Sequence, residues 1–323
     1  MISRLLSLSL VSLAFALAPA KAALAAYPDK PIRLIVPSAP GGAPDVLMRA
    51  LADQLSRQMN VPIVIDNKPG GSYVIGTMEV LRAPADGYTL GYGNVVSLAT
   101  NKSLLANVPY DAEKDLTLIS NAVRVVNIVS VNNDVPVKSI PELIAYAKKN
   151  PDKLAFGSDG NGTTAHLGME LFKSMTGVRM LHVPYKAATA AITDLIGGGV
   201  QVLMSNTPAI APMVQQGRVR ALGITSLQRS PTFPDIPPIA DAVPGYELIS
   251  WGGLVGPANL PKDVVTRLNH EIRTALESQS VRERFKTLGA DATPSTPEEF
   301  RELSRRETEK WAKVVKSSGA KVD

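Results

Sequence analysis

The sequence predicts an α/β fold of two doubly wound domains joined by crossing strands. Three observations lead to this prediction. First, apolar runs of strand type alternate with amphipathic helical patterns. Second, the succession of a strand, a glycine loop and a helix occurs twice. Third, a long β-type run lies between these two occurrences. We expect residues 27–124 to form the first part of domain 1, residues 125–228 to form domain 2, and residues 229–323 to return to domain 1.

The first 26 residues have the pattern of a secretory signal peptide. Arg4 lies in the n-region, residues 5–18 are apolar, and an alanine-rich stretch ends at Ala26. The apolar run is too short for a membrane anchor, and no later stretch approaches the length of a membrane-spanning segment. We therefore expect residues 1–26 to be removed on export to a bacterial periplasm, and the mature protein to be soluble there.

The composition excludes several kinds of site and partner. The chain contains no cysteine, which excludes disulfides, thiolate metal sites, a lipid-modified cysteine and a cysteine nucleophile. Removing Arg4 and Lys21 with the signal peptide lowers the formal charge from +5 to +3, and no dense basic tract remains. We therefore expect no nucleic-acid partner.

The chain is organised around a strand-to-helix stretch at residues 32–55. Residues 32–36 form a short apolar run, Pro40-Gly41-Gly42 breaks it, and apolar residues three and four apart then predict an amphipathic helix. Glycines at a helix N-terminus leave backbone N–H groups at the positive end of the helix dipole, which suits an anion. A tight connection without a ligand is the alternative, and this stretch considered alone favours that alternative.

Further elements complete the first half. Residues 61–65 and 88–92 are strand-like and residues 74–82 are helical, which predicts a βαβαβ unit. If its strand order is 2-1-3, the crevice lies where loops 38–45 and 93–97 meet.

The second half repeats the pattern of the first. Residues 118–131 form the long β-type run that we expect to cross between domains, and Ser139-Ile140-Pro141-Glu142 predicts a capping box and a helix to about residue 149. A strand at 154–156, a glycine loop at 157–164 and a helix at 166–175 follow. The second crevice is predicted at loops 157–164 and 205–208.

The last part of the chain is expected to rejoin the first domain. A proline-rich segment at 230–238 predicts the return linker, and a strand at 248–255 and a helix at 261–277 follow it. Thr296 and Glu299 predict a second capping box, with Pro297 at the first helical position of a terminal helix that reaches about residue 315.

Motifs of catalysis and cofactor binding are missing from both glycine loops. Neither loop contains the Gly-Lys-Ser/Thr of a P-loop or the dinucleotide fingerprint. The three histidines lack the spacing of a zinc helix, and Phe156 stands where a nucleophile elbow at Ser158 would need glycine. We therefore expect no catalytic residue, no metal and no cofactor, and a binding protein rather than an enzyme. His166 is close enough to a glycine loop to reach a ligand.

Short motifs of one known family occur along nearly the whole mature chain. In the first half they are Tyr27-Pro28-Asp29-Lys30-Pro31-Ile32-Arg33, Pro40-Gly41-Gly42 with Asp45, Pro69-Gly70-Gly71, and Pro84-Ala85-Asp86-Gly87-Tyr88-Thr89-Leu90. Later in the chain they are Val183-Pro184-Tyr185-Lys186, Thr296-Pro297-Glu298-Glu299-Phe300 and Lys310-Trp311-Ala312-Lys313-Val314-Val315. With these motifs together, the sequence resembles the extracytoplasmic solute receptors of tripartite tricarboxylate transporters, also called Bug proteins.

The resemblance implies a periplasmic binding protein of flytrap architecture. Such a receptor closes over a small, usually carboxylate-bearing metabolite and delivers it to the membrane permease subunits of a tripartite tricarboxylate-type transporter. Carried over position by position, the ligand-binding residues are Ser38, Ala39, Gly41, Gly42, Asp45, Asn94, Ser158, Gly162, Thr163, Thr164, His166 and Asn206. We expect a monomer. A ligand-sensing co-receptor for a membrane histidine kinase is the alternative, and a periplasmic hydrolase is a remote one.

The sequence departs from the family pattern close to the expected site. Ser38 stands where an aromatic residue is common, Ala43-Pro44 replaces a pair that usually contains Ser or Thr, Asn94 stands where Thr is frequent, and Ser205 stands where Asp is frequent. Proline at the first helical position has no N–H, and Asp45 puts a carboxylate in the first turn. We therefore expect the first-domain end of the ligand to be the less anionic end, with any carboxylate facing residues 157–164.

Overall fold

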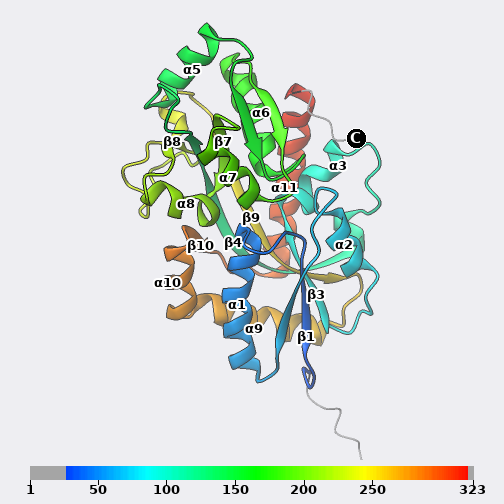
Figure 1. Cartoon of the computed structure of the whole chain (residues 1–323). Helices are drawn as coiled ribbons and strands as arrows, with labels where there is room; N and C mark the ends of the chain where they lie inside the picture. The colour runs from blue at the N-terminus through cyan, green and yellow to red at the C-terminus, as the bar shows by residue number, and fades with distance from the viewer. Residues whose placement is uncertain (1–26, 319–323) are drawn as a thin grey trace, which may run out of the picture.

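A ten-stranded sheet connects the two halves of the protein (Figure 1). The computed structural model describes residues 27–318, so the expected signal peptide lies outside the described residues. The strand order is β2-β1-β3-β9-β4-β7-β5-β6, and β8 and β10 pair with β4. The strands are β1 (Ile32–Val36), β2 (Ile63–Asn67), β3 (Thr89–Asn94), β4 (Leu116–Val131), β5 (Ala155–Ser158), β6 (Leu181–Pro184), β7 (Val202–Asn206), β8 (Arg220–Ile224), β9 (Ile249–Pro257) and β10 (Ala290–Ala292).

Helices cover both faces of this sheet. They are α1 (Ala43–Met59), α2 (Val74–Leu81), α3 (Asn101–Leu104), α4 (Ala112–Asp115), α5 (Ile140–Lys149), α6 (Thr164–Thr176), α7 (Ala188–Gly197), α8 (Thr207–Gln215), α9 (Lys262–Glu277), α10 (Gln279–Thr287) and α11 (Pro297–Ser318). Two further turns are the π-helical η1 (Val96–Thr100) and the 3₁₀-helical η2 (Ile239–Asp241). None of the helices in residues 27–318 is long and apolar enough to cross a membrane.

The first half has the strand order 2-1-3 that the sequence analysis considered. Strand β1 is parallel to both β2 and β3. Its residues Leu34 and Val36 pack with the apolar face of α1 and with α9, while Ile35 faces the opposite layer, which includes Phe300 and Trp311 of α11. A central strand buried on both faces reads as a continuous apolar run, which is the pattern of residues 32–36.

The second half repeats this arrangement around β5. Strand β5 is parallel to β6 and β7. Phe156 packs with α5 and α6 on one face, and Leu203 packs with α7 and α8 on the other. Both halves are therefore doubly wound, so the fold class predicted from the sequence is confirmed.

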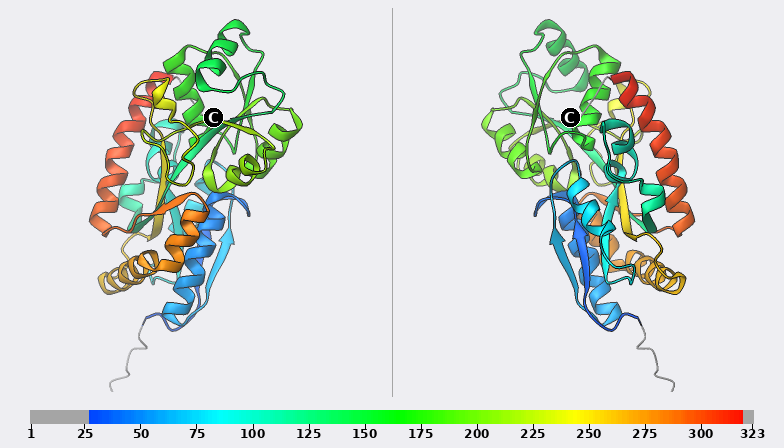
Figure 2. Two further views of the ribbon diagram at one scale, coloured as in Figure 1. Left: turned by 90° about the vertical axis from the view of Figure 1, so that its left-hand side faces the viewer. Right: turned by 90° about the vertical axis from the view of Figure 1, so that its right-hand side faces the viewer.

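Strand β4 belongs to both halves. Its residues from Leu116 to Val126 pair antiparallel with β9, and those from Asn127 to Val131 pair with β7. The predicted crossing run is therefore a single strand whose ladder changes partner between Val126 and Asn127. Helix α11 also connects the halves, because it packs on η1 and α3 and reaches α6 (Figure 2).

The proline-rich segment after β8 packs on the second half. Phe233 and Ile236 join the cluster that contains α7 and α8, and Ile239 and Tyr246 join the cluster that contains α5 and α6. The Tyr246 hydroxyl donates to the carbonyl of Gly168 at 3.0 Å. Irregularly spaced apolar anchors of this kind give no periodic signal in a sequence. From this packing we propose that the chain returns to the first half at β9, about 20 residues later than the expected boundary at residue 229.

Both predicted capping boxes begin helices, with one difference. In α11, Thr296 accepts from the Glu299 N–H at 3.1 Å and Glu299 accepts from the Thr296 N–H at 2.8 Å. In α5, Ser139 accepts from the Glu142 N–H at 3.3 Å, but Glu142 accepts from the N–H of Lys138. The carboxylate therefore satisfies a donor one residue before the cap, where the extended chain enters the helix.

The close approach of β9 to β4 makes a prediction about Gly253. A Cβ at this position would contact the Ser120 carbonyl oxygen and lie 2.6 Å from the Asn121 Cα, and neither backbone atom can move aside alone. We expect Gly253→Ala to lower the free energy of unfolding by about 1–3 kcal/mol or more, measured by urea denaturation. Gly197→Ala is the control, because a Cβ at the end of α7 meets nothing within 4 Å. Equal stability of the two variants would contradict this account of the crossing.

Candidate functional site

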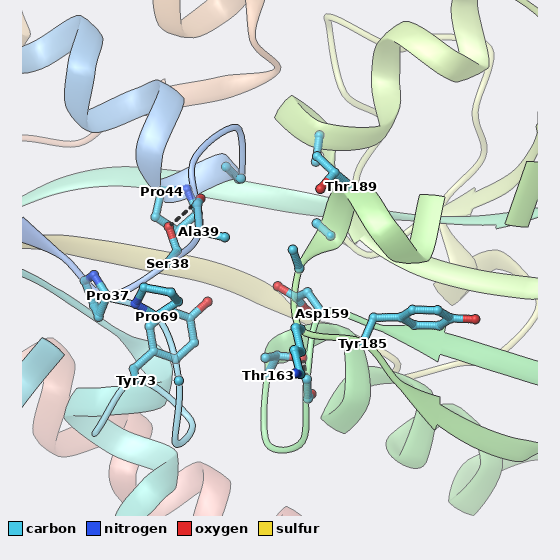
Figure 3. Close-up of a pocket in the computed structure, with 18 of the residues that line it drawn as sticks. Pro37, Ser38, Ala39, Pro44, Pro69, Tyr73, Asp159, Thr163, Tyr185 and Thr189 are labelled. Atoms are coloured by element: carbon cyan, nitrogen blue, oxygen red, sulfur yellow. Dashed lines mark hydrogen bonds between the residues drawn. The ribbon is translucent and has the colours of Figure 1, made fainter. Parts of the chain in front are cut away.

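A cavity of about 480 Å³ lies between the two halves (Figure 3). Five loops line it, and each loop follows the carboxyl end of a parallel strand. The lining residues are Pro37, Ser38, Ala39, Gly42, Ala43 and Pro44 after β1, Pro69 to Tyr73 after β2, Asp159, Gly160, Asn161 and Thr163 after β5, Tyr185 to Thr189 after β6, and, at the fifth strand, Ser205 and Asn206 at the end of β7 with Ala209 of α8. This edge is where doubly wound sheets bind ligands.

Asp45 fixes the β1–α1 loop from behind. One carboxylate oxygen accepts from the Gly41 N–H at 2.9 Å, and the other accepts from the Asn67 amide and pairs with Arg49, both at 2.9 Å. Asp45 is 3% exposed. Burial by itself would raise the pKa of Asp45, but hydrogen bonds from Arg49, Gly41 and Asn67 together hold it below its usual value. Its charge is therefore used within the loop and does not face the cavity.

The N-terminus of α1 does face the cavity. Gly42 is the N-cap and supplies no side-chain oxygen, so the first backbone N–H groups of this 17-residue helix have no side-chain cap. The helix begins at Ala43, so Pro44 is the second helical residue and not the first as expected from the sequence. Ser38, Ala39 and Gly42 contribute to the lining beside it. Among the described residues, no acidic side chain lines this end of the cavity; the first-turn carboxylate of Asp45, which offsets part of the positive helix dipole, lies behind the loop.

The second glycine loop is held by two stacked histidines. His166 accepts from the Gly162 N–H through Nδ1 at 3.0 Å, and His182 lies 2.7 Å from the Ser158 hydroxyl through Nε2. The two rings stack with centroids 4.0 Å apart. Burial lowers the pKa of His166, and burial with the neighbouring His166 lowers that of His182 to about 3. Both rings are therefore neutral supports of the loop at neutral pH.

Thr163 and Thr164 have different partners. Thr163 is the N-cap of α6: its hydroxyl accepts from the His166 N–H at 3.4 Å and donates to the Gly160 carbonyl at 2.9 Å. The Thr164 hydroxyl accepts from Ser250 at 3.0 Å, and Asn206 donates its amide to the same Ser250 hydroxyl at 2.9 Å. These bonds form a polar network at the base of the cavity, where β4 and β9 cross.

The expected site residues divide into three groups. Ser38, Ala39, Gly42, Thr163 and Asn206 line the cavity. Asn94 and Thr164 line a smaller space of about 20 Å³ beside it, and Asn94 also accepts from the N–H groups of Val96 and Ser97. The remaining expected residues do not line the main cavity and support its loops: Gly41, Asp45, Ser158, Gly162 and His166.

Sequence reasoning missed two of the five loops. Residues 69–73 after β2 and residues 185–189 after β6 contribute to the lining, together with Asp159 of the second glycine loop. The signal was available, because Pro69-Gly70-Gly71 and Val183-Pro184-Tyr185-Lys186 are among the family motifs. In a parallel sheet the carboxyl ends of neighbouring strands meet at one edge, so these loops also had to reach the crevice.

Among residues 27–318, the charged residues that line the cavity are Asp159 and Lys186. Asp159 Oδ1 is buried and has no hydrogen-bond partner among residues 27–318. Burial raises the pKa of Asp159, and hydrogen bonds from Thr163 and from its own N–H offset only part of this effect. Lys186 is exposed and takes part in no ion pair between described residues. The Tyr185 ring points away from the cavity, because its hydroxyl donates a hydrogen bond to the Asp194 carboxylate (Figure 3).

The lining of the cavity provides groups that can bind a ligand. Within residues 27–318, no three His, Cys, Asp or Glu side chains are placed together to hold a metal ion. The Ser158 and His182 pair is the nearest approach to a nucleophile and a base, but Ser158 is fully buried and His182, with its lowered pKa, is a weak base. Neither residue lines the cavity.

The hydrogen bonds of the buried Asp45 carboxylate predict a loss of stability when this residue is replaced. We expect Asp45→Asn to lower the free energy of unfolding by about 1–3 kcal/mol at pH 7, because hydrogen bonds to a buried charge are lost. The pKa of Asp45 is lowered in the folded state, so its contribution is present above about pH 4 and disappears as the pH falls through the folded pKa. Chemical denaturation between pH 3 and 7 measures this.

Asp53 provides the control on the same helix. Its side chain is exposed, so Asp53→Asn should leave stability unchanged over the same range. A deficit of Asp45→Asn that persists undiminished at pH 3 would show that the charge of Asp45 is not responsible.

Comparison with known proteins identifies the family of the chain. A sequence profile described as the tripartite tricarboxylate transporter family receptor matches residues 47–320. The protein BugT of Bordetella pertussis is 36% identical over 298 residues, which are 92% of this chain and 91% of BugT. A protein of Pseudomonas sp. encoded in a tcbD–tcbE intergenic region is 36% identical over 294 residues, 90% of this chain and 87% of that protein.

Solved structures agree with this assignment. The R. palustris protein Rpa4515 with adipate superposes with a TM-score of 0.89 at 36% identity, over 92% of this chain and all of that chain. The periplasmic binding protein BugD gives 0.87 at 32% identity, over 91% and 99% of the two chains. MatC of Rhodopseudomonas palustris with bound malate gives 0.85 at 26% identity, over 90% and 100%. The resemblance found in the sequence is confirmed, and the chain belongs to the tripartite tricarboxylate transporter receptor family, as a periplasmic solute receptor of the TctC and Bug type.

Proposed function

We propose that this chain binds a small carboxylate-bearing metabolite in the cavity between its halves and delivers it to the membrane subunits of a tripartite tricarboxylate-type transporter. The observation that carries the proposal is the cavity itself, which is lined by five loops at the carboxyl ends of parallel strands. Its volume of about 480 Å³ suits a small metabolite. The superposable structures that contain adipate and malate support a carboxylate as the bound group.

The carboxylate is assigned to the space between two helix N-termini. Helix α7 begins after Ala187, which like Gly42 of α1 supplies no side-chain cap. The two helix starts approach each other, since a Cβ on Gly41 would lie 3.8 Å from Thr189 Cγ2. Lys186 stands two residues before the first residue of α7 and adds a cation to the lining. Uncapped N–H groups, two helix dipoles and a lysine are the groups that hold a carboxylate.

Closure of the halves around the ligand follows from the same geometry. The Ser72 hydroxyl of the first half donates to the Asn161 carbonyl of the second half at 2.7 Å, across the cavity wall. We assign the bending to β4 near Val126 and Asn127, where its partner changes from β9 to β7. Helix α11 limits the range of this motion, because it packs on both halves.

Two other functions use parts of the same site. Presentation of the ligand to a membrane histidine kinase would use the same closure. A periplasmic hydrolase would need an accessible nucleophile with a base, and the buried Ser158 and His182 pair does not supply one. Transport is favoured over sensing by the family of the chain.

The proposed function predicts that the native ligand is released chemically unchanged. Mass spectrometry of the supernatant after denaturing purified protein should show a small carboxylic acid, and incubation of that acid with fresh protein should leave its mass the same. Solution scattering should show a smaller radius of gyration when this ligand saturates the protein. Release of a hydrolysed product, or of a compound with no carboxyl group, would contradict the proposal.

Lys186 provides a site-directed test. We expect Lys186→Ala to weaken the affinity for the released acid about tenfold, by loss of about 1.4 kcal/mol, because a charge-assisted contact is removed. Isothermal calorimetry measures the affinity, with adipate and malate as further probes. Lys148→Ala is the matched control, since Lys148 is an exposed lysine on α5 that does not line the cavity. If both variants bind as the wild type does, the carboxylate does not lie at the start of α7.

A further inference from the structure

Asp159 is half-buried and presents to the cavity a carboxylate that forms no ion pair with the residues that the structure describes. Its Oδ1 is buried without a hydrogen-bond partner among the described residues, and no ion pair within residues 27–318 includes Asp159. Figure 3 shows Asp159 on the second-half wall and Tyr73 on the opposite wall. Burial raises the pKa of the Tyr73 hydroxyl, and the negative charge of Asp159 adds to this effect. A carboxylate oxygen that is buried without a partner costs free energy, so a ligand group that bonds it would be bound favourably.

The cavity lining therefore carries charges of both signs. The uncapped starts of α1 and α7, with Lys186, form a positive end. The wall that carries Asp159 and Asn161 offers a carboxylate and no cation, and its loop is the neighbour of the Lys186 loop, because the Tyr185 N–H donates to the Ser158 carbonyl at 3.0 Å. The expectation from the sequence was the reverse, with a ligand carboxylate facing residues 157–164. It depended on Asp45, whose carboxylate is occupied by Gly41, Asn67 and Arg49 and does not line the cavity.

We propose that Asp159 binds a protonated nitrogen of the ligand, so that the ligand is an amino carboxylate rather than a dicarboxylate. This inference rests on the proposed function, which places the ligand's carboxylate at the positive end. One Lys and one Asp line the cavity, so a zwitterion of net charge zero matches both. A second carboxylate would instead meet Asp159 at close range, and like charges in a partly buried site repel strongly. Recognition would thus work both by attraction of the amine and by rejection of a second acid.

Chain-matched probes separate these cases. The six-carbon set is 6-aminohexanoate, adipate and hexanoate, and the four-carbon set is 4-aminobutanoate, succinate and butanoate. Within a set the carboxylate and the chain are the same, and only the far end differs. For at least one chain length, calorimetry at pH 7 should show the amino acid binding to the wild type about tenfold tighter than the diacid.

Asp159→Asn should then reverse the preference. The variant keeps the size and one oxygen of the side chain, and it removes the negative charge. We expect the amino acid to lose about tenfold in affinity, the diacid to gain, and the monoacid to change little. Asp134→Asn is the control, because it removes one exposed charge from the same half away from the cavity. The melting temperature of Asp159→Asn should equal or exceed that of the wild type, since a buried unpaired carboxyl group is removed.

The outcomes distinguish this inference from the proposed function. If the wild type prefers the diacid, or if Asp159→Asn leaves the preference unchanged, the role of Asp159 is refuted while carboxylate binding stands. If no member of either set binds the wild type, the inferred ligand class is refuted. The proposed function fails separately, when the compound released from the native protein has no carboxyl group.

Discussion

The pairing of β4 with β9 is the interaction on which the rest of the structure depends. Nearly the whole length of β9 lies against β4, and the ladder of β4 then continues into β7 and β8 without a break in the strand. This continuity brings the carboxyl edges of the two parallel units, β1 with its neighbours and β5 with its neighbours, to face one space. Gly252 and Gly253 permit the close approach, because a Cβ at either position would contact backbone of a neighbouring strand. The cavity is thus a consequence of strand pairing.

Polar groups at this crossing are bonded to one another before any ligand is present. Asn206 donates to Asn127 of β4 at 2.6 Å and to Ser250 of β9, and Ser250 donates to Thr164 at the start of α6. Buried polar groups in a low-dielectric site are costly unless they are satisfied, and a connected set also fixes the direction of each member. Two residues with the chemistry of ligand donors, Asn206 and Thr164, therefore help first to hold the helix starts in place. A ligand can bond only the donor and acceptor positions of these two side chains that the network leaves free.

The two glycine loops share one principle of construction. In each, a side chain four residues after a glycine accepts from the N–H of that glycine: Asp45 from Gly41, and His166 from Gly162. Support from behind leaves the wall of the loop to backbone and small side chains, which suits a receptor that recognises its ligand by shape and dipoles. Against such a wall, the carboxylate of Asp159 is an exception. A charge that the scaffold leaves unpaired is more informative about the ligand than the backbone donors that surround it.

The sequence alone determined the fold class, the family and the positions of the glycine loops. Apolar periodicity, two capping boxes and the strand-like run at 118–131 are local signals, and local signals are sufficient where each element obeys its own pattern. They gave no sign that the segment after β8 packs on the second half, because Phe233, Ile236 and Tyr246 are isolated anchors without a period. Nor could they show which polar residues face the cavity. Asp45 and Asp159 both lie close to glycines in loops that precede a helix. The Asp45 side chain turns back and accepts from its own loop, whereas Asp159 lines the cavity with an oxygen that has no partner among the described residues. That difference depends on which side of the loop meets the packed core, and only the tertiary structure decides it.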